Sequence, residues 1–254
     1  MSYIILAKKM NLHQSVKSKV WYNVFRNLFF DFYYKLLSIK YLFLPKKGVL
    51  LYLGLNYGKG FDKLHWQYTK AIGIEANPDL YAMLQKRYRY NKHIQLVHAA
   101  ATTFNGEVTF NISDNHGLSS SLGQLKEAFG GIKMVKSVTV PAINLYDYVR
   151  KENIEFITDY VSDIQGNDLA VLKTMQPYIE QGKIMRITSE VAKDKYKNSY
   201  MDLPDNSESG FDELLSKNYQ LVSKGWENLK ENHFQEVPED WWEMDCMWKL
   251  KLNQ

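Results

Sequence analysis

Residues 49–60, VLLYLGLNYGKG, constrain the fold more than any other part of the chain. A short apolar run breaks there into three glycines, and a second apolar run at 71–74 ends at Glu75. A strand, a glycine turn and a second strand tipped by a carboxylate are typical of nucleotide-binding α/β domains. The stretch therefore predicts a parallel sheet with a ligand at the carboxyl edge of its strands.

The spacing of the glycines limits the class of ligand. A dinucleotide fingerprint reads G-x-G-x-x-G, whereas this turn reads G-x-x-x-G-x-G from Gly54 to Gly60. A phosphate-binding P-loop has a hydroxyl residue after its lysine, but Gly60 follows Lys59. The turn fits a nucleoside or zwitterionic ligand that approaches the backbone, with Glu75 placed to accept hydrogen bonds from ribose hydroxyls. A glycine turn needed only for tight packing is the alternative.

Alternating strand and helix patterns follow the turn. Strands separated by helices favour a parallel sheet with helices on both faces. Because no strong crossover helix joins the last two strands, we expect them to pair antiparallel. The strands that we expect lie at 49–53, 71–74, 94–101, 107–112, 135–140, 158–164, 183–188, 219–223 and 246–252, and the helices at 61–66, 78–90, 144–149, 168–175 and 211–217.

The chain has 254 residues and 45% hydrophobic residues, enough for one well-packed domain, which we place at 46–254. Residues 20–44 of the preceding segment, 1–45, are rich in aromatic side chains. Charged residues interrupt this run, so no stretch reaches the roughly 20 apolar residues that cross a bilayer. We expect an N-terminal helical extension that either packs on the domain or lies peripherally on a membrane surface or a protein partner.

Charge and cysteine content exclude several classes of function. The net charge of +4 comes from 32 basic and 28 acidic residues spread along the chain, so we expect no nucleic-acid partner. A lone Cys246 forms no internal disulfide and no cysteine-based zinc cluster. Scarce cysteine and an amino terminus without the order of a secretory signal predict a cytoplasmic protein.

Five motifs occur in the order and roughly the spacing of the FkbM-type methyltransferases. They are GLNYG at 54–58, IEANP at 74–78, GLSSSL at 117–122, VTVPAINLYDYV at 138–149 and DIQGNDLAVL at 163–172. The chain resembles a divergent member of this family. The resemblance implies S-adenosylmethionine as methyl donor and a class I methyltransferase (Rossmann-like) fold, with a seven-stranded, mostly parallel sheet and an antiparallel last strand. It also implies an alcohol or sugar hydroxyl as the usual acceptor class, and we expect an enzyme that methylates a hydroxyl of a sugar or glycan.

The resemblance also assigns donor-binding residues. Gly54, Asn56 and Gly58 would line the methionine portion, and Glu75 the ribose. Tyr52 stands where the family has an aspartate, which removes one contact to the donor's amine. Ala99 and Ala100, at the end of the expected third strand, would lie near the adenine by their position and not by a motif. The remaining donor-binding residues that we expect are Ser120, Asp163 and Gln165.

Two carboxylates are the main candidates for the chemistry. Asp163 and Glu190 are both expected at the carboxyl ends of neighbouring strands, where they would converge. The pair would act as a base, or would hold Mg²⁺ or Mn²⁺ that lowers the pKa of the acceptor hydroxyl. His116 in the serine-rich loop is a third catalytic candidate. A helix cap for Asp163 and an ion pair with Lys193 or Lys195 for Glu190 are the structural alternatives.

Acceptor recognition is expected from the less regular parts of the chain. The polar segment 194–210 predicts a lid, and aromatic side chains there and near the end of the chain suit sugar rings. These side chains are Tyr196, Tyr200, Trp226, Trp241 and Trp242. The alternative function is a degenerate methyltransferase fold that serves as a membrane- or protein-docking module.

Overall fold

The computed structural model describes Ile39 and residues 44–115, 117–126, 131–197, 199–226 and 231–251. Nearly all of the expected N-terminal extension at 1–45 lies outside these residues, so that extension and its domain boundary stay predictions. His116 also lies outside them. Within the described ranges, no helix combines the length and the apolar character that a membrane span requires.

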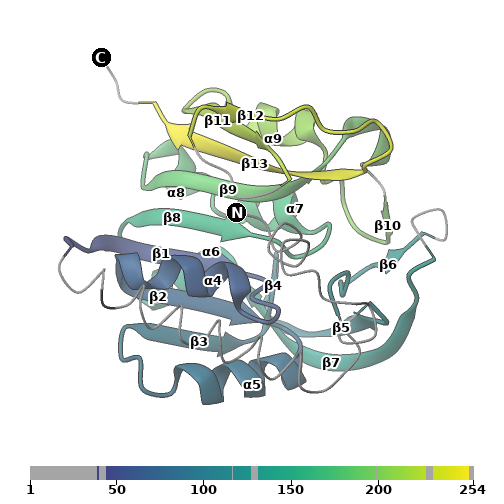
Figure 1. Cartoon of the computed structure of the whole chain (residues 1–254), viewed down its shortest axis with the longest axis horizontal. Coiled ribbons are helices and arrows are strands. Elements are labelled where there is room, and N and C mark those ends of the chain that lie inside the picture. The colour runs from purple at the N-terminus through teal and green to yellow at the C-terminus, as the bar shows by residue number, and fades with distance from the viewer. Residues whose placement is uncertain are drawn as a thin grey trace, which may run out of the picture.

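An eight-stranded sheet runs through the centre of the domain (Figure 1). The strand order is β12-β11-β13-β9-β8-β1-β2-β3. The five strands from β3 to β9 pair parallel, and β13 pairs antiparallel with β9 and β11. The strands are β1 (Lys47–Leu53), β2 (Tyr68–Glu75), β3 (Ile94–His98), β8 (Ile157–Ser162), β9 (Ile184–Ala192), β11 (Tyr219–Gly225), β12 (His233–Phe234) and β13 (Glu243–Leu250).

The expected α/β sheet with an antiparallel last strand is confirmed, but the expected count of seven strands is wrong. The two-residue strand β12 adds an eighth strand at one edge, parallel to β11. The long apolar run expected as one strand at 94–101 is also divided. Ala99 donates its amide to the Glu75 carbonyl at 3.2 Å, and beyond this residue the chain leaves the main sheet. An apolar run predicts that a segment is buried, but it does not predict where the chain passes from one sheet to another.

Helices cover both faces of the main sheet, as expected. Leu50 of β1 packs in a cluster with side chains of α4 and α5, whereas Leu51 and Leu53 point to the opposite face. This division follows from the alternation of side chains along a strand. The helices are α4 (Lys59–Leu64), α5 (Pro78–Tyr88), α6 (Leu145–Lys151), α7 (Asp168–Thr174), α8 (Gln176–Glu180) and α9 (Glu208–Leu215), with short 3₁₀ turns η1 (His65–Gln67) and η2 (Asp194–Tyr196).

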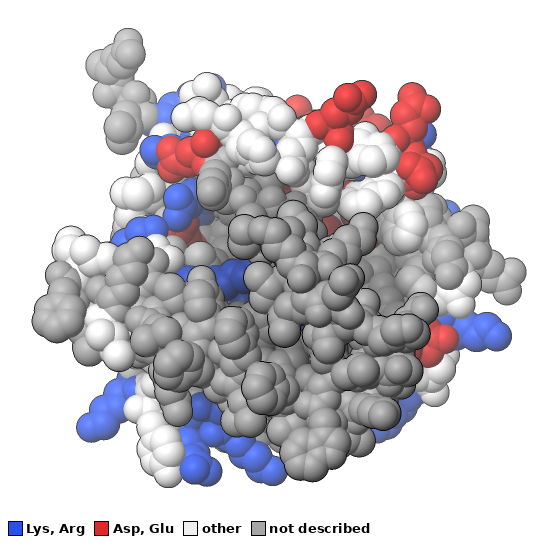
Figure 2. Space-filling model, in the orientation of Figure 1, with Lys and Arg blue, Asp and Glu red and all other residues white. Residues whose placement is uncertain are grey.

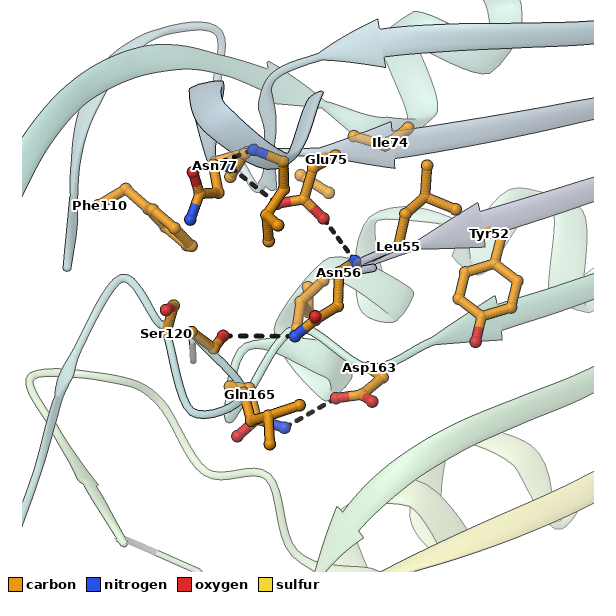
Figure 3. Close-up of a pocket in the computed structure, with 18 of the residues that line it drawn as sticks. Tyr52, Leu55, Asn56, Ile74, Glu75, Asn77, Phe110, Ser120, Asp163 and Gln165 are labelled. Atoms are coloured by element: carbon orange, nitrogen blue, oxygen red, sulfur yellow. Dashed lines mark hydrogen bonds between the residues drawn. The ribbon is translucent and has the colours of Figure 1, made fainter. Parts of the chain in front are cut away.

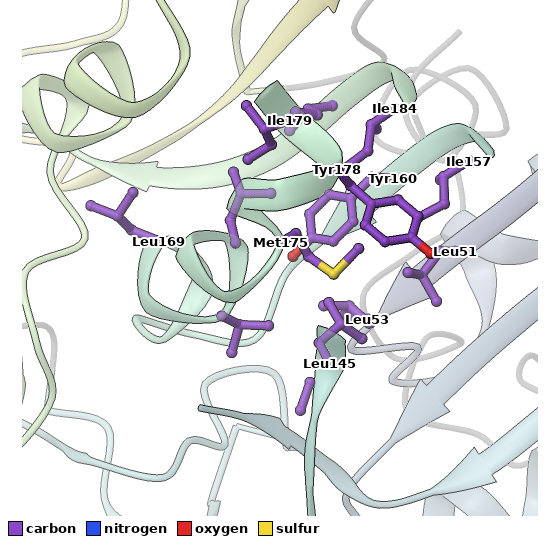
Figure 4. Packing of buried hydrophobic residues seen from close by; sticks show 14 of the residues in the cluster. Leu51, Leu53, Leu145, Ile157, Tyr160, Leu169, Met175, Tyr178, Ile179 and Ile184 are labelled. Atoms are coloured by element: carbon purple, nitrogen blue, oxygen red, sulfur yellow. The ribbon is translucent and has the colours of Figure 1, made fainter. Parts of the chain in front are cut away.

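The larger core lies between the sheet and α6, α7, α8 and α9 (Figure 4). Tyr160 of β8 and Met175 after α7 are fully buried there, and Phe211 of α9 stacks on Trp248 of β13 with ring centroids 5.3 Å apart. Asn144 caps the start of α6, where its side chain accepts a hydrogen bond from the Asp147 amide. This packing fixes the strands whose ends carry the site.

Two smaller sheets stand beside the carboxyl edge of the main sheet. The first has the order β4-β7-β5, with β4 (Ala100–Thr102) parallel and β5 (Gly106–Ser113) antiparallel to β7 (Met134–Asn144). The strands expected at 107–112 and 135–140 are therefore present but belong to this separate sheet. The second pairs β6 (Gln124–Leu125) with β10 (Tyr200–Met201), far apart in the sequence.

Charged side chains are spread over the face seen in Figure 2. Blue Lys and Arg side chains show along the lower edge, where α5 lies in Figure 1, and red Asp and Glu side chains show along the upper edge. Grey atoms cover the middle of this view. The expectation of no nucleic-acid partner rests on the charge balance and stays a prediction.

Candidate functional site

A pocket opens at the carboxyl ends of β1, β2 and β8, the edge at which the sequence places a ligand (Figure 3). Gly58 and Glu190 are not among its lining residues, and His116 lies outside the described residues. The predicted residues that line the pocket are Gly54, Asn56, Glu75, Ala99, Ala100, Ser120, Asp163 and Gln165.

The glycine turn brings the ends of β1 and β8 into contact. Gly54 has φ 76°, and a Cβ added there would lie 1.9 Å from the Asp163 carbonyl oxygen. No other residue type fits this position without moving the backbone. Gly58 has φ 78° and caps α4, so its role is to turn the chain into the helix.

Glu75 is held at the tip of β2 by two backbone amides. Its two carboxylate oxygens accept hydrogen bonds from Asn56 N and Asn77 N, each at 2.7 Å. Burial raises the pKa of Glu75 to about 7, although the amide donors act in the opposite direction. Each oxygen keeps a further lone pair, so the carboxylate can also accept hydrogen bonds from two vicinal hydroxyls of a ligand.

The end of the pocket beyond Glu75 is apolar. Ala99 and Ala100 are buried beside Phe110 of β5, and Leu122 lines the same pocket. Figure 3 shows Phe110 and Asn77 at this end and Tyr52 at the opposite end, with Asn56 between them. Sequence reasoning missed Phe110 and Leu122 as site residues. The alternation of β5 predicts that Phe110 is buried but not what its face contacts, and Leu122 lies in a loop without a hydrophobic period. Such walls suit a flat aromatic base.

Gln165 joins the two predicted carboxylates. Its Nε2 donates to Asp163 Oδ1 and to Glu190 Oε2, both at 2.7 Å, and its Oε1 accepts from the Tyr200 hydroxyl at 2.6 Å. The structure thus brings Asp163 and Glu190 together, as their expected strand positions require. Sequence reasoning missed the role of Tyr200, because no local signal links it to a residue so far away in the chain.

Burial raises the pKa of both members of the carboxylate pair. Burial raises the pKa of Asp163, although hydrogen bonds from Gln165 and Glu190 lower it. Burial and the charge of Asp163 hold the pKa of Glu190 well above its usual range. Burial also raises the pKa of Glu243 to about 8 and that of Asp245 to about 7. In the part of the chain that the structure describes, no group of three or more His, Cys, Asp or Glu side chains is arranged to hold a metal ion.

The predicted lid segment 194–210 contains η2, β10 and the start of α9. The ring of Tyr200 in β10 packs closely against Gly166, where an added Cβ would lie 2.7 Å from the ring atom Cδ2. Of the other aromatic residues predicted to bind an acceptor, Trp226 and Trp241 pack edge to face with centroids 5.3 Å apart. None of the predicted aromatic residues is among the lining residues of the pocket. Their acceptor role stays a prediction.

The sequence matches the family described as Methyltransferase FkbM domain over residues 55–220. No curated protein matches the sequence. Among solved structures, a methyltransferase FkbM from Methylobacillus flagellatus is 16% identical with a TM-score of 0.46, over 81% of this chain and 43% of that chain. This chain therefore spans less than half of the length of that protein.

Two further solved structures are similar at lower identity. The fibrillarin of Aeropyrum pernix with bound S-adenosyl-L-methionine is 8% identical, with a TM-score of 0.44 over 80% of this chain and 67% of that chain. An S-adenosylmethionine-dependent methyltransferase from Clostridium acetobutylicum is also 8% identical, with a TM-score of 0.43 over 90% of this chain and 98% of that chain.

Proposed function

Because this chain belongs to the FkbM methyltransferase family, we propose that it transfers a methyl group from S-adenosylmethionine to a hydroxyl of a sugar or glycan acceptor. The observation that carries the proposal is the arrangement of Glu75, bonded by the amides of Asn56 and Asn77, between an apolar end and a carboxylate end of one pocket. These residues fit the three parts of the donor in order: base, ribose and amino acid.

Glu75 would accept hydrogen bonds from the ribose hydroxyls, and Ala99, Ala100 and Phe110 would pack against the base. Gly54 would let the amino-acid portion approach the backbone. The donor supplies an electrophilic methyl group bound to a sulfonium. The residues of the chain hold that group and the acceptor in line, and positioning of this kind supplies a large part of the rate enhancement.

The carboxylate pair would handle the proton of the acceptor. Asp163 lines the pocket and Glu190 does not, so Asp163 would accept the proton that the acceptor oxygen loses while the new carbon–oxygen bond forms and the carbon–sulfur bond of the donor breaks, which releases S-adenosylhomocysteine. Glu190 and Gln165 would orient Asp163 through the hydrogen bonds already described. His116 stays a candidate for the same role.

A divalent cation on Asp163 and Glu190 is the second way in which these carboxylates can act, and it stays a prediction. Titration of Mg²⁺ or Mn²⁺ into the protein tests it. A cation site predicts a binding heat that disappears in both Asp163→Ala and Glu190→Ala, whereas the base mechanism predicts no cation binding and full methyl transfer in chelator.

The proposed reaction is tested by transfer of a labelled methyl group from S-adenosylmethionine to a panel of free sugars, glycans and amines. We expect alkali-stable methyl ethers on hydroxyl acceptors and none with Asp163→Asn. Label on amines alone would refute the acceptor class. Donor binding without transfer to any acceptor would instead favour the docking-module function.

A further inference from the structure

Tyr52 is the departure from the family pattern that the proposed site leaves without a role. Its ring lies edge to face on Phe61, with centroids 5.9 Å apart, and it lines the pocket. A Cβ added at Gly60 would lie 2.2 Å from the Tyr52 hydroxyl oxygen. The hydroxyl therefore rests directly over the backbone of α4, in space that only a glycine at position 60 leaves open.

This hydroxyl has no hydrogen-bond partner among the residues that the structure describes. Burial raises the pKa of Tyr52, and the charges of Asp163 and Asp245 raise it further, so the phenol stays protonated. A protonated phenol offers one donor. At a pocket wall, an unused donor of this kind is available to a ligand that carries an acceptor.

The rest of the pocket decides which part of the donor lies nearest to Tyr52. The apolar end beside Phe110 takes the base, and Glu75 takes the ribose, so the amino-acid portion lies at the end where Figure 3 shows Tyr52 and Asp163. That portion carries one ammonium and one carboxylate. Of these two groups only the carboxylate can accept a hydrogen bond, and Tyr52 has the hydrogen to donate to it.

We propose that the Tyr52 hydroxyl donates a hydrogen bond to the carboxylate of the donor's amino-acid portion, in contrast to the family aspartate at this position, which offers an acceptor. The proposal rests on the proposed function. Tyr52 is then a binding residue for the carboxylate of the donor. The position of the Tyr52 hydroxyl depends on Gly60, because a side chain at residue 60 would occupy the space that the hydroxyl fills.

Calorimetric titration of the full chain tests this assignment, with three ligands as probes and two proteins. The probes are S-adenosylhomocysteine, its decarboxylated form S-adenosyl-3-thiopropylamine, and 5′-methylthioadenosine, which lacks the whole amino-acid portion. The proteins are the wild type and Tyr52→Phe, which keeps the ring on Phe61. We expect Tyr52→Phe to lower the affinity for S-adenosylhomocysteine by about 10- to 100-fold, which corresponds to the loss of one hydrogen bond to a charged group. The other two probes should change by less than about twofold, within the scatter of such a measurement.

Each other outcome overturns the proposal in a recognisable way. An equal loss for all three probes would mean that Tyr52 shapes the pocket as a whole, and no loss for S-adenosylhomocysteine would mean that its hydroxyl does not touch the donor. A wild-type protein that binds none of the probes would remove the proposed function itself. Tyr52→Asp is the reversing variant: it should shift the preference from S-adenosylhomocysteine toward the decarboxylated probe, and an unchanged preference contradicts the assignment.

Discussion

Glu75 predicts a pH dependence of donor binding with a definite sign. Its pKa is raised to about 7 by burial, and its proposed role is to accept hydrogen bonds from ribose hydroxyls, which favours the ionised form. With a pKa of about 7, roughly one tenth of the carboxyl groups are ionised at pH 6 and roughly nine tenths at pH 8. The association constant for S-adenosylhomocysteine should therefore rise about tenfold from pH 6 to pH 8.

Isothermal titration calorimetry measures this rise, and the same titrations in buffers of different ionisation enthalpy should show release of roughly half a proton at pH 7. Asp163 and Asp245 also have raised pKa values, so the control is Glu75→Gln, in which the share that Glu75 contributes disappears. The reasoning is refuted by an affinity that falls or stays level with rising pH in the wild type. It is equally refuted if Glu75→Gln retains the full slope.

Three further predictions concern stability and positioning. Asp168 is fully buried and its pKa is raised to about 7, so the folded state binds this proton more tightly than the unfolded state. This group alone should lower the free energy of unfolding by about 1 kcal/mol from pH 6 to pH 8, and in urea titrations of Asp168→Asn the fall between these pH values should be smaller by that amount. Gly60→Ala should lower the free energy of unfolding by about 1–3 kcal/mol through its clash with the Tyr52 hydroxyl. In a Tyr52→Phe background the loss should be smaller, because only the ring carbon Cζ, 3.2 Å from the added Cβ, remains in tight contact; additive effects in the double-mutant cycle would contradict this. Tyr200→Phe leaves the buried Gln165 oxygen without its donor, so we expect a loss of about 1–3 kcal/mol in thermal unfolding, and an unchanged melting temperature would show that this hydrogen bond is dispensable.

The parts of the fold that were predictable from the sequence are those that local patterns determine. The run before Gly54 and the run ending at Glu75 gave two neighbouring parallel strands, because a glycine turn and a terminal carboxylate mark both ends of the unit. The antiparallel pairing of β11 with β13 followed from the missing crossover helix. The division of the apolar run at Ala99 and the added strand β12 were not predictable, since both depend on which strands the chain meets in space.

The same limit applies to the site. Glu75 and Asp163 were found as strand-end carboxylates, and the convergence of Glu190 with Asp163 required only the order of neighbouring strands. The contact of Tyr200 with Gln165 and the space that Gly60 leaves for Tyr52 are tertiary facts. Tyr52 was visible in the sequence as a departure from the family pattern, but the direction of its hydroxyl was not.

The most direct test of the donor site is a crystal structure of the full chain with S-adenosylhomocysteine bound. We expect the ribose hydroxyls within hydrogen-bonding distance of the Glu75 carboxylate, the base against Phe110, and the amino-acid portion beside Tyr52 and Asp163. A ligand bound elsewhere, or bound here with its ribose away from Glu75, would contradict this expectation.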